Sequence, residues 1–154
     1  NKYELITETG HLKLDRVVYS SLAYPFAYGC IPRTWDEDGD PLDVEIVSVT
    51  EPLIPGSIVE ARIIGVMKFD DGGEVDDKVI AVLADDKRMA HISSFKDLGE
   101  HWLKETTYYW EHYKDLKKPG TCTVNGFFGI EEAVEVIKDC EDRYKKEIDP
   151  KLVN

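Results

Sequence analysis

Residues 36–45 read DEDGDPLDVE, and this stretch decides how the rest of the chain is interpreted. A Gly and a Pro in its middle indicate a turn, and the apolar residues after them alternate with acidic ones, which is typical of a half-buried strand. Asp38, Asp40 and Asp43 are therefore predicted to lie on a tight loop and on the first residues of a strand. There, a rigid backbone can direct three carboxylates into one small volume.

Crowded carboxylates disfavour one another's ionisation, so such a cluster must stay solvated or bind cations. The stretch alone leaves both interpretations open. A calcium-binding EF-hand loop starting at Asp36 is excluded, because it needs Gly at its sixth position and Glu at its twelfth, where this chain has Pro41 and Val47. Within the stretch, Asp36 and Glu45 are expected to be solvated or to lie behind the cation ligands.

A second acidic stretch, DDGGEVDDK at residues 70–78, resembles the first in its glycines and carboxylates. It follows a long β-branched strand predicted over residues 57–69 and leads into another over residues 79–84. Two acidic loops at neighbouring strand ends can meet in space. The second loop therefore favours a cation site over a solvated turn.

The apolar period predicts further elements around these loops. Strands are expected over residues 12–19 and 121–125, and an amphipathic helix over residues 97–113 with Asp97 as its N-cap. A last helix over residues 130–146 carries the apolar stripe Ile130, Val134, Ile137, Cys140 and Tyr144. This order predicts an α+β fold: a small closed or partly closed mixed β-barrel, OB-like, with helices packed on it and a C-terminal amphipathic helix. Residues 1–154 are expected to form a single domain.

Composition narrows the classes of partner. The chain has 154 residues, 42% of them hydrophobic, and a net charge of −12, which repels nucleic acid and anionic lipid. No apolar run approaches about 18 residues and no signal-peptide pattern is present, so neither membrane nor nucleic acid is expected as a partner. Cys30, Cys122 and Cys140 lack paired spacing, which indicates a reducing, cytoplasmic location, and they are expected to be core residues.

The polar residues without an evident structural role form one chemical set. The hard oxygen ligands are Asp38, Asp40, Asp43, Asp71 and Asp76, and the cations are Lys2, Arg16, Lys78 and Lys114. Oxygen-only ligands select Mg²⁺, Mn²⁺ or Ca²⁺ over zinc, and metals beside Lys and Arg make a site for phosphate. Arg16 also fits an edge-strand arginine with no such role. No Ser or Cys lies near a His in a recognisable motif, so nothing in the sequence indicates a covalent intermediate.

These residues resemble a known family. DGDPLDV at residues 38–44 matches the signature of the family I soluble inorganic pyrophosphatases of prokaryotic type. The segments NKYE (1–4), LDRVVYS (14–20), YPFAYG (24–29), GVMKF (65–69) and EHYKDL (111–116) follow in that family's order and approximate spacing. The resemblance covers most of the chain.

The resemblance implies a role for each matching position. Asp40 would accept the proton from a bridging water, and Tyr24 would support the site. The implied metal ligands are Asp38, Asp43, Asp71, Asp76 and Glu4. The implied phosphate-binding residues are Lys2, Arg16, Tyr28, Lys78, Tyr113 and Lys114, although Lys78 could equally be a counter-ion for Asp43 and Asp76.

The implied reaction is Mg²⁺-dependent hydrolysis of pyrophosphate to two phosphates by direct attack of a metal-bridged hydroxide, without a covalent intermediate. Several Mg²⁺ ions per site are expected, and Mn²⁺ or another divalent ion could substitute for them. The resemblance also implies a homo-oligomer, namely a hexamer.

The chain departs from the family in two places. The family carries an earlier segment before NKYE, and its His-Phe-Phe run is Tyr108-Tyr109-Trp110 here. Two alternatives remain: hydrolysis of another phosphoanhydride, and a non-catalytic metal- or phosphate-binding protein.

Overall fold

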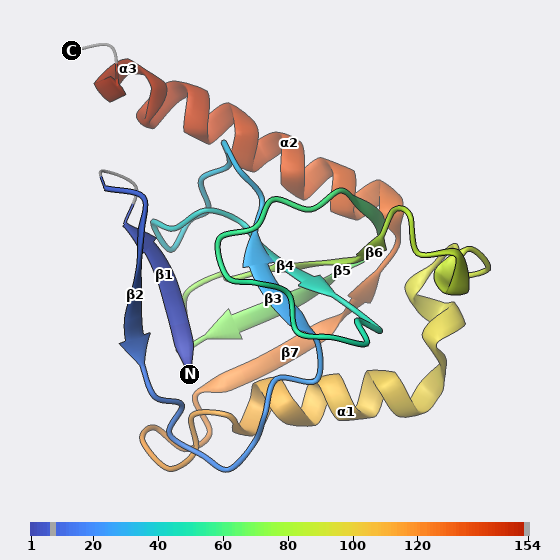
Figure 1. Cartoon of the computed structure of the whole chain (residues 1–154). Coiled ribbons are helices and arrows are strands. Elements are labelled where there is room, and N and C mark those ends of the chain that lie inside the picture. Colours follow the sequence, from blue (N-terminus) through green and yellow to red (C-terminus); the bar gives the residue numbers. More distant parts are fainter. Residues whose placement is uncertain (7–8, 153–154) are drawn as a thin grey trace.

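The computed structural model describes residues 1–6 and 9–152 and shows an α+β fold (Figure 1). The strands are β1 (Lys2–Ile6), β2 (His11–Arg16), β3 (Ala27–Cys30), β4 (Asp43–Ile46), β5 (Ala61–Asp71), β6 (Lys78–Leu83) and β7 (Cys122–Phe128). The helices are α1 (Gly99–His112), α2 (Ile130–Glu147) and the short α3 (Asp149–Leu152), with 3₁₀ turns η1 (Lys87–Met89) and η2 (Phe95–Leu98). The predicted order is confirmed: most strands come first, and one late strand, β7, lies between the two long helices.

The strands form two sheets. Five of them have the order β3-β4-β6-β5-β7, in which β4 and β6 are parallel and the other neighbours antiparallel. β1 and β2 form a separate antiparallel hairpin beside this sheet (Figure 1). The α+β class with a mixed sheet is therefore confirmed. Among the described residues the sheet is open at β3 and β7, and no closed barrel is present.

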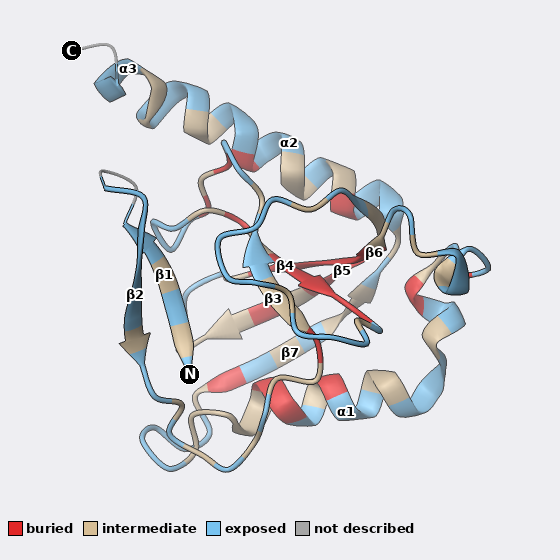
Figure 2. Cartoon of the chain, in the orientation of Figure 1, coloured by how far each residue is buried: buried red, intermediate tan, exposed pale blue. Residues whose placement is uncertain are grey.

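The centre of the sheet is covered on both faces, because β6 contributes alternate side chains to two apolar clusters. Ile80 and Val82 join the cluster that contains Tyr109 and Trp110 of α1. Val79 and Ala81 join the cluster that contains Cys140 of α2. The two long helices thus lie on opposite faces, and the buried residues gather between them (Figure 2).

Two details of the predicted helices need correction. Asp97 is not the N-cap of α1. Its carboxylate instead accepts hydrogen bonds from the backbone N–H groups of Ser93 and Ser94, which forms a capping box on η2 before α1 begins at Gly99. In α2, Cys140 of the predicted stripe is buried, but Ile130 is exposed because it occupies the first turn.

The three cysteines differ in how far they are buried. Cys122 and Cys140 are buried, as expected for core residues, and all three cysteines are free thiols. Cys30 is exposed, so its prediction as a core residue was wrong; it ends β3, an edge strand.

None of the helices in residues 1–6 and 9–152 is long and apolar enough to cross a membrane.

Candidate active site

One pocket gathers most of the predicted site residues from across the fold. Its walls come from both acidic loops, the end of β5, the segment before β6, the end of α1 and the β1–β2 hairpin. The predicted residues that line it are Lys2, Arg16, Tyr24, Tyr28, Asp38, Asp40, Asp43, Asp71, Asp76, Tyr113 and Lys114. Of the predicted residues, Glu4 and Lys78 are outside this lining. The two acidic loops do meet in space, as the sequence suggested.

Lys78 lies beneath the pocket and joins two of its carboxylates. The parallel pairing of β4 with β6 places Asp43 opposite Lys78, whose Nζ lies 2.7 Å from Asp43 Oδ2 and also donates to Asp76 Oδ1. The Lys78 side chain is fully buried. Burial alone would lower the pKa of Lys78, but Asp43 and Asp76 outweigh it and raise that pKa, so the ammonium stays charged. The position supports the counter-ion alternative.

Two carboxylates of the pocket resist ionisation. Burial, together with the negative charge of Asp43, raises the pKa of Asp76 to about 6, despite the opposing charge of Lys78. Burial also raises the pKa of Asp38, and the nearby carboxylates act in the same direction. Burial is the main cause of both shifts, and the neighbouring carboxylates add to it.

A second ion pair in the pocket joins Asp71 and Lys114. Lys114 Nζ donates to Asp71 Oδ2, and the Tyr113 hydroxyl lies 3.4 Å from the same oxygen. Burial opposes ionisation of Asp71, but the hydrogen bond and charge of Lys114 outweigh it, so the pKa of Asp71 is lowered. Burial raises the pKa of Tyr113, which therefore remains a hydrogen-bond donor.

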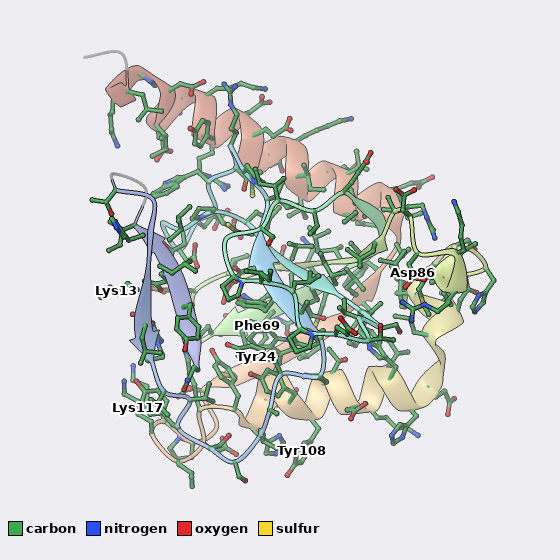
Figure 3. All side chains as sticks on the ribbon, in the orientation of Figure 1. Lys13, Tyr24, Phe69, Asp86, Tyr108 and Lys117 are labelled. Carbon is green, nitrogen blue, oxygen red and sulfur yellow. The ribbon has the colours of Figure 1, made fainter. Side chains whose placement is uncertain are left out.

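Aromatic rings form the floor. The Tyr28 hydroxyl donates to Asp43 Oδ2, and burial raises the pKa of Tyr28 well above its usual value. Tyr24 stacks on Tyr28 with ring centroids 5.3 Å apart, and Figure 3 shows Tyr24 near Phe69 in the middle of the molecule. Both Tyr24 and Phe69 contact the ring of Trp110, which also lines the pocket. These contacts hold the phenols in fixed positions.

The hairpin supplies two cations at the rim. Lys2 and Arg16 are paired in the register of β1 with β2, and both line the pocket. Lys2 Nζ lies 3.1 Å from Glu4 Oε1, so Glu4 reaches the site through Lys2. Arg16 bonds the neighbouring Asp15 and is partly exposed. Its position at the pocket favours an anion-binding role over that of an isolated edge-strand arginine.

The donor set fits hard divalent cations in its chemistry. The five aspartates that line the pocket offer only oxygen ligands, which suit Mg²⁺ rather than zinc. In the described part of the chain, no three carboxylate, His or Cys side chains converge as they stand into a metal-ligand group. Three of them, Asp43, Asp71 and Asp76, instead pair with Lys78, Tyr28 or Lys114. Neighbouring carboxylates add to the effect of burial in raising the pKa of Asp38 and of Asp76, and a divalent cation bound there would offset that repulsion.

Four residues in or beside the pocket lie outside the predicted set of site residues: Trp110, Glu45, Asp36 and Tyr19. Trp110 lines the pocket, although no site role was assigned to it from the sequence. Glu45 and Asp36 are buried, which excludes the solvated alternative and leaves the one in which they lie behind the cation ligands. Glu45 Oε1 accepts a hydrogen bond from Trp110 Nε1, and burial raises the pKa of Glu45 to about 8. Tyr19 also lies at the pocket and accepts a hydrogen bond from Lys117 Nζ at 2.9 Å.

Comparisons with known proteins identify the family of this chain. A family model described as inorganic pyrophosphatase matches residues 1–145. The chain is 46% identical over 147 residues to soluble inorganic pyrophosphatase 3 of Arabidopsis thaliana, covering 96% of this chain and 67% of that protein. It is 45% identical over 148 residues to an inorganic pyrophosphatase of Neisseria meningitidis, covering 96% of this chain and 83% of the relative.

Solved structures show the same fold. The crystal structure of an inorganic pyrophosphatase from Neisseria gonorrhoeae superposes with a TM-score of 0.88 at 45% identity, covering 94% of this chain and 83% of that one. The inorganic pyrophosphatase of Thermus thermophilus gives a TM-score of 0.86 at 41% identity, with 94% and 84% covered. The chain therefore belongs to the inorganic pyrophosphatase family and is by that membership an inorganic diphosphatase.

Proposed function

We propose that this chain hydrolyses inorganic pyrophosphate to two orthophosphates, that it depends on Mg²⁺, and that water attacks phosphorus directly without a covalent intermediate. One observation carries the proposal: a single pocket combines five aspartates with Lys2, Arg16 and Lys114. Carboxylates alone would repel a pyrophosphate anion, and cations alone would not bind divalent metal. Their combination suits a magnesium–pyrophosphate substrate.

Asp38, Asp43, Asp71 and Asp76 are the residues that would hold the metal ions, with Glu4 acting from the hairpin through Lys2. Divalent ions bound there would neutralise phosphoryl oxygens and lower the pKa of a water molecule. Mn²⁺ has similar ligand preferences and could replace Mg²⁺. To receive these ions, Asp43 and Asp71 would exchange part of their present contacts with Tyr28 and Lys114 for metal bonds.

Asp40 is the proposed proton acceptor. Its carboxylate lines the pocket and has no hydrogen bond or ion pair with any described residue, unlike those of Asp43, Asp71 and Asp76. The loop nevertheless fixes its backbone, because Asp40 N donates to Asp38 Oδ1 and Asp40 O accepts from Asp36 N. A free carboxylate on a fixed backbone can accept a proton from an attacking water.

The cations and phenols would bind the two phosphoryl groups. Lys2 and Arg16 approach from the hairpin, while Tyr113 and Lys114 approach from the end of α1. Tyr28 would contribute its hydroxyl, and Tyr24 would support Tyr28 by stacking. Because these groups come from two different elements, one set can bind the attacked phosphoryl group and the other can stabilise charge on the leaving phosphate. We assign Lys78 the counter-ion role, since it is fully buried.

Phosphate release from pyrophosphate, ATP and tripolyphosphate, each with Mg²⁺ and with a chelator, tests the proposal. We expect rapid release from pyrophosphate with Mg²⁺, much slower release from the other two substrates, and none with the chelator. Dominant cleavage of ATP or tripolyphosphate would replace the proposed substrate. Tight Mg²⁺ binding in calorimetry without any turnover would show a non-catalytic binding protein instead.

We further propose that the chain forms a single domain, that it assembles into a homo-hexamer, and that it is located in the cytoplasm. The outer side of α1 supports the oligomer, because Tyr108 is exposed there and stacks on His112 with ring centroids 4.1 Å apart (Figure 3). The free thiols support a reducing compartment. Light scattering coupled to size exclusion would measure the mass in solution, for which we expect about six times that of one chain.

A further inference from the structure

The last helix reaches the acidic loop, although its sequence pattern indicated packing alone. Arg143 of α2 directs its guanidinium at residues 35–37, which lead into the loop that carries Asp38 and Asp40. Arg143 Nη1 donates to Trp35 O at 2.8 Å and lies 3.4 Å from Asp36 Oδ1. Arg143 Nη2 lies 3.3 Å from Glu37 Oε1. One planar group therefore contacts three consecutive residues.

A second contact fixes the helix relative to the same segment. The backbone N–H of Trp35 donates to Cys140 O at 2.9 Å, one turn before Arg143. Cys140 is buried under the sheet with the apolar cluster that includes Leu42, the residue just before Asp43. Residues 35–37 are thus attached to α2 by both a backbone bond and a side chain. The loop cannot shift without breaking contacts to the helix.

Asp36 transmits this attachment to the proposed base. Its side chain is only 8% exposed, and its backbone N–H donates to Asp40 O at 2.8 Å. Asp36 O accepts from Gly39 N at 3.2 Å, and Asp36 Oδ1 accepts from Glu37 N at 2.8 Å. Asp36 therefore closes the turn on which Asp38 and Asp40 stand. An unbroken series of contacts runs from Arg143 to the backbone of Asp40.

We propose that Arg143 and Asp36 form a positioning pair through which α2 fixes the carboxylates of Asp38 and Asp40 for the reaction. Neither residue lines the pocket, so the pair acts through the loop rather than on the substrate. This inference rests on the proposed function, because it assigns the pair to that same site. A displacement of a reacting group by about 1 Å can reduce a rate by up to about 100-fold, so a small shift of the loop would be measurable.

The test compares four variants. Arg143→Met removes the guanidinium and keeps the apolar stem, and Arg143→Lys keeps the charge without the planar fork. Asp36→Asn removes the charge and keeps the size, which gives a second route if one Arg143 variant folds poorly. Lys145→Met is the matched control: Lys145 lies on the same helix, is largely exposed, and among the described residues its side chain bonds Asp142 alone, at 2.9 Å.

Two readouts distinguish positioning from general support of the fold. In metal-free protein, amide hydrogen exchange of residues 36–43 is measured against that of β5 as an internal reference. For Arg143→Met we expect loop exchange to rise on the order of 10-fold while β5 is unchanged. With Mg²⁺ and pyrophosphate, we expect kcat to fall on the order of 10-fold and KM to change by less than about 3-fold, since the phosphate-binding cations stand on other elements. Arg143→Lys should lie between wild type and Arg143→Met, and Lys145→Met should match wild type.

The proposal is overturned if Arg143→Met leaves loop exchange and kcat within about 2-fold of wild type, or if exchange rises equally in β5 and the loop. A wild-type chain that releases no phosphate from pyrophosphate would refute the proposed function instead. In that case the exchange comparison still decides whether Arg143 fixes the loop.

Discussion

Trp110 Nε1 donates a hydrogen bond to Glu45 Oε1 at 2.5 Å, joining α1 to the inner strand β4 in the fully buried region beneath the pocket. The other carboxylate oxygen, Glu45 Oε2, is buried without a hydrogen-bond partner in the described structure. The same indole lies 5.0 Å from Lys78 Nζ and 5.2 Å from the ring of Tyr113. The pair therefore adjoins the residues that hold the site together.

Glu45→Gln should flatten the pH dependence of stability. Burial raises the pKa of Glu45 from 4.5 to about 8, so the folded state holds one more proton than the unfolded state between these values. The free energy of unfolding contributed by Glu45 is thus largest at low pH and falls by up to about 1.4 kcal/mol per pH unit as pH rises toward 8. Urea unfolding in chelator at pH 5, 6, 7 and 8 measures this slope.

Glu51→Gln is the control for this slope, because Glu51 is an exposed carboxylate on the loop after β4. It should leave the slope at the wild-type value. Equal slopes in Glu45→Gln and wild type would contradict the assignment of the slope to Glu45.

Lys78→Met should destabilise the metal-free protein and be partly rescued by Mg²⁺. The substitution leaves Asp43 and Asp76 close together without their shared cation, and removing one partner of a buried pair costs about 3 kcal/mol. A bound divalent cation would restore part of the lost attraction. Urea unfolding with chelator and with Mg²⁺ measures both effects.

Lys104→Met provides the matched control, since Lys104 is 76% exposed and pairs only with Glu100 on the surface of α1. We expect it to change stability by less than about 1 kcal/mol under either condition. If Lys78→Met cost no more than this control, Lys78 would not be a structural counter-ion.

Strands and helices that follow from local sequence pattern were predicted correctly. The burial of residues that a distant element covers was not. Period-two alternation located β4, and the apolar stripe located α2 to within one residue of its end. The same alternation counts Glu45 as an outward residue, but β4 is an inner strand covered by α1, so both faces are buried. Nothing near Asp36 in sequence indicates that Arg143, 107 residues later, covers it. The carboxylates and cations of the site were found because their chemistry is local to each motif.

Gly65→Ala should destabilise the fold, because β5 has no room for a side chain there. A Cβ at this position would lie 2.6 Å from Phe128 O and 2.9 Å from Phe95 Cδ1. The neighbours include backbone of β7 and would have to move, at a cost of about 1–3 kcal/mol. Thermal unfolding measures the loss. Gly29→Ala in β3 is the control, since a Cβ there meets nothing within 4 Å, and a loss as large as that of Gly65→Ala would contradict the steric explanation.

Asp40→Asn should remove most turnover while metal binding remains. The substitution keeps the shape of the side chain and removes its basicity, and a general base contributes about 10²- to 10⁴-fold to a rate. Because the other four aspartates of the pocket are unchanged, calorimetry should find Mg²⁺ affinity near the wild-type value. Phosphate release from pyrophosphate at saturating Mg²⁺ measures kcat, with Glu74→Gln in the second acidic loop as a control that removes an exposed carboxylate. Wild-type kcat in Asp40→Asn would remove Asp40 from its role. A parallel loss of Mg²⁺ affinity would make it a metal ligand rather than the base, because a free carboxylate that only accepts a proton contributes little to binding the cation.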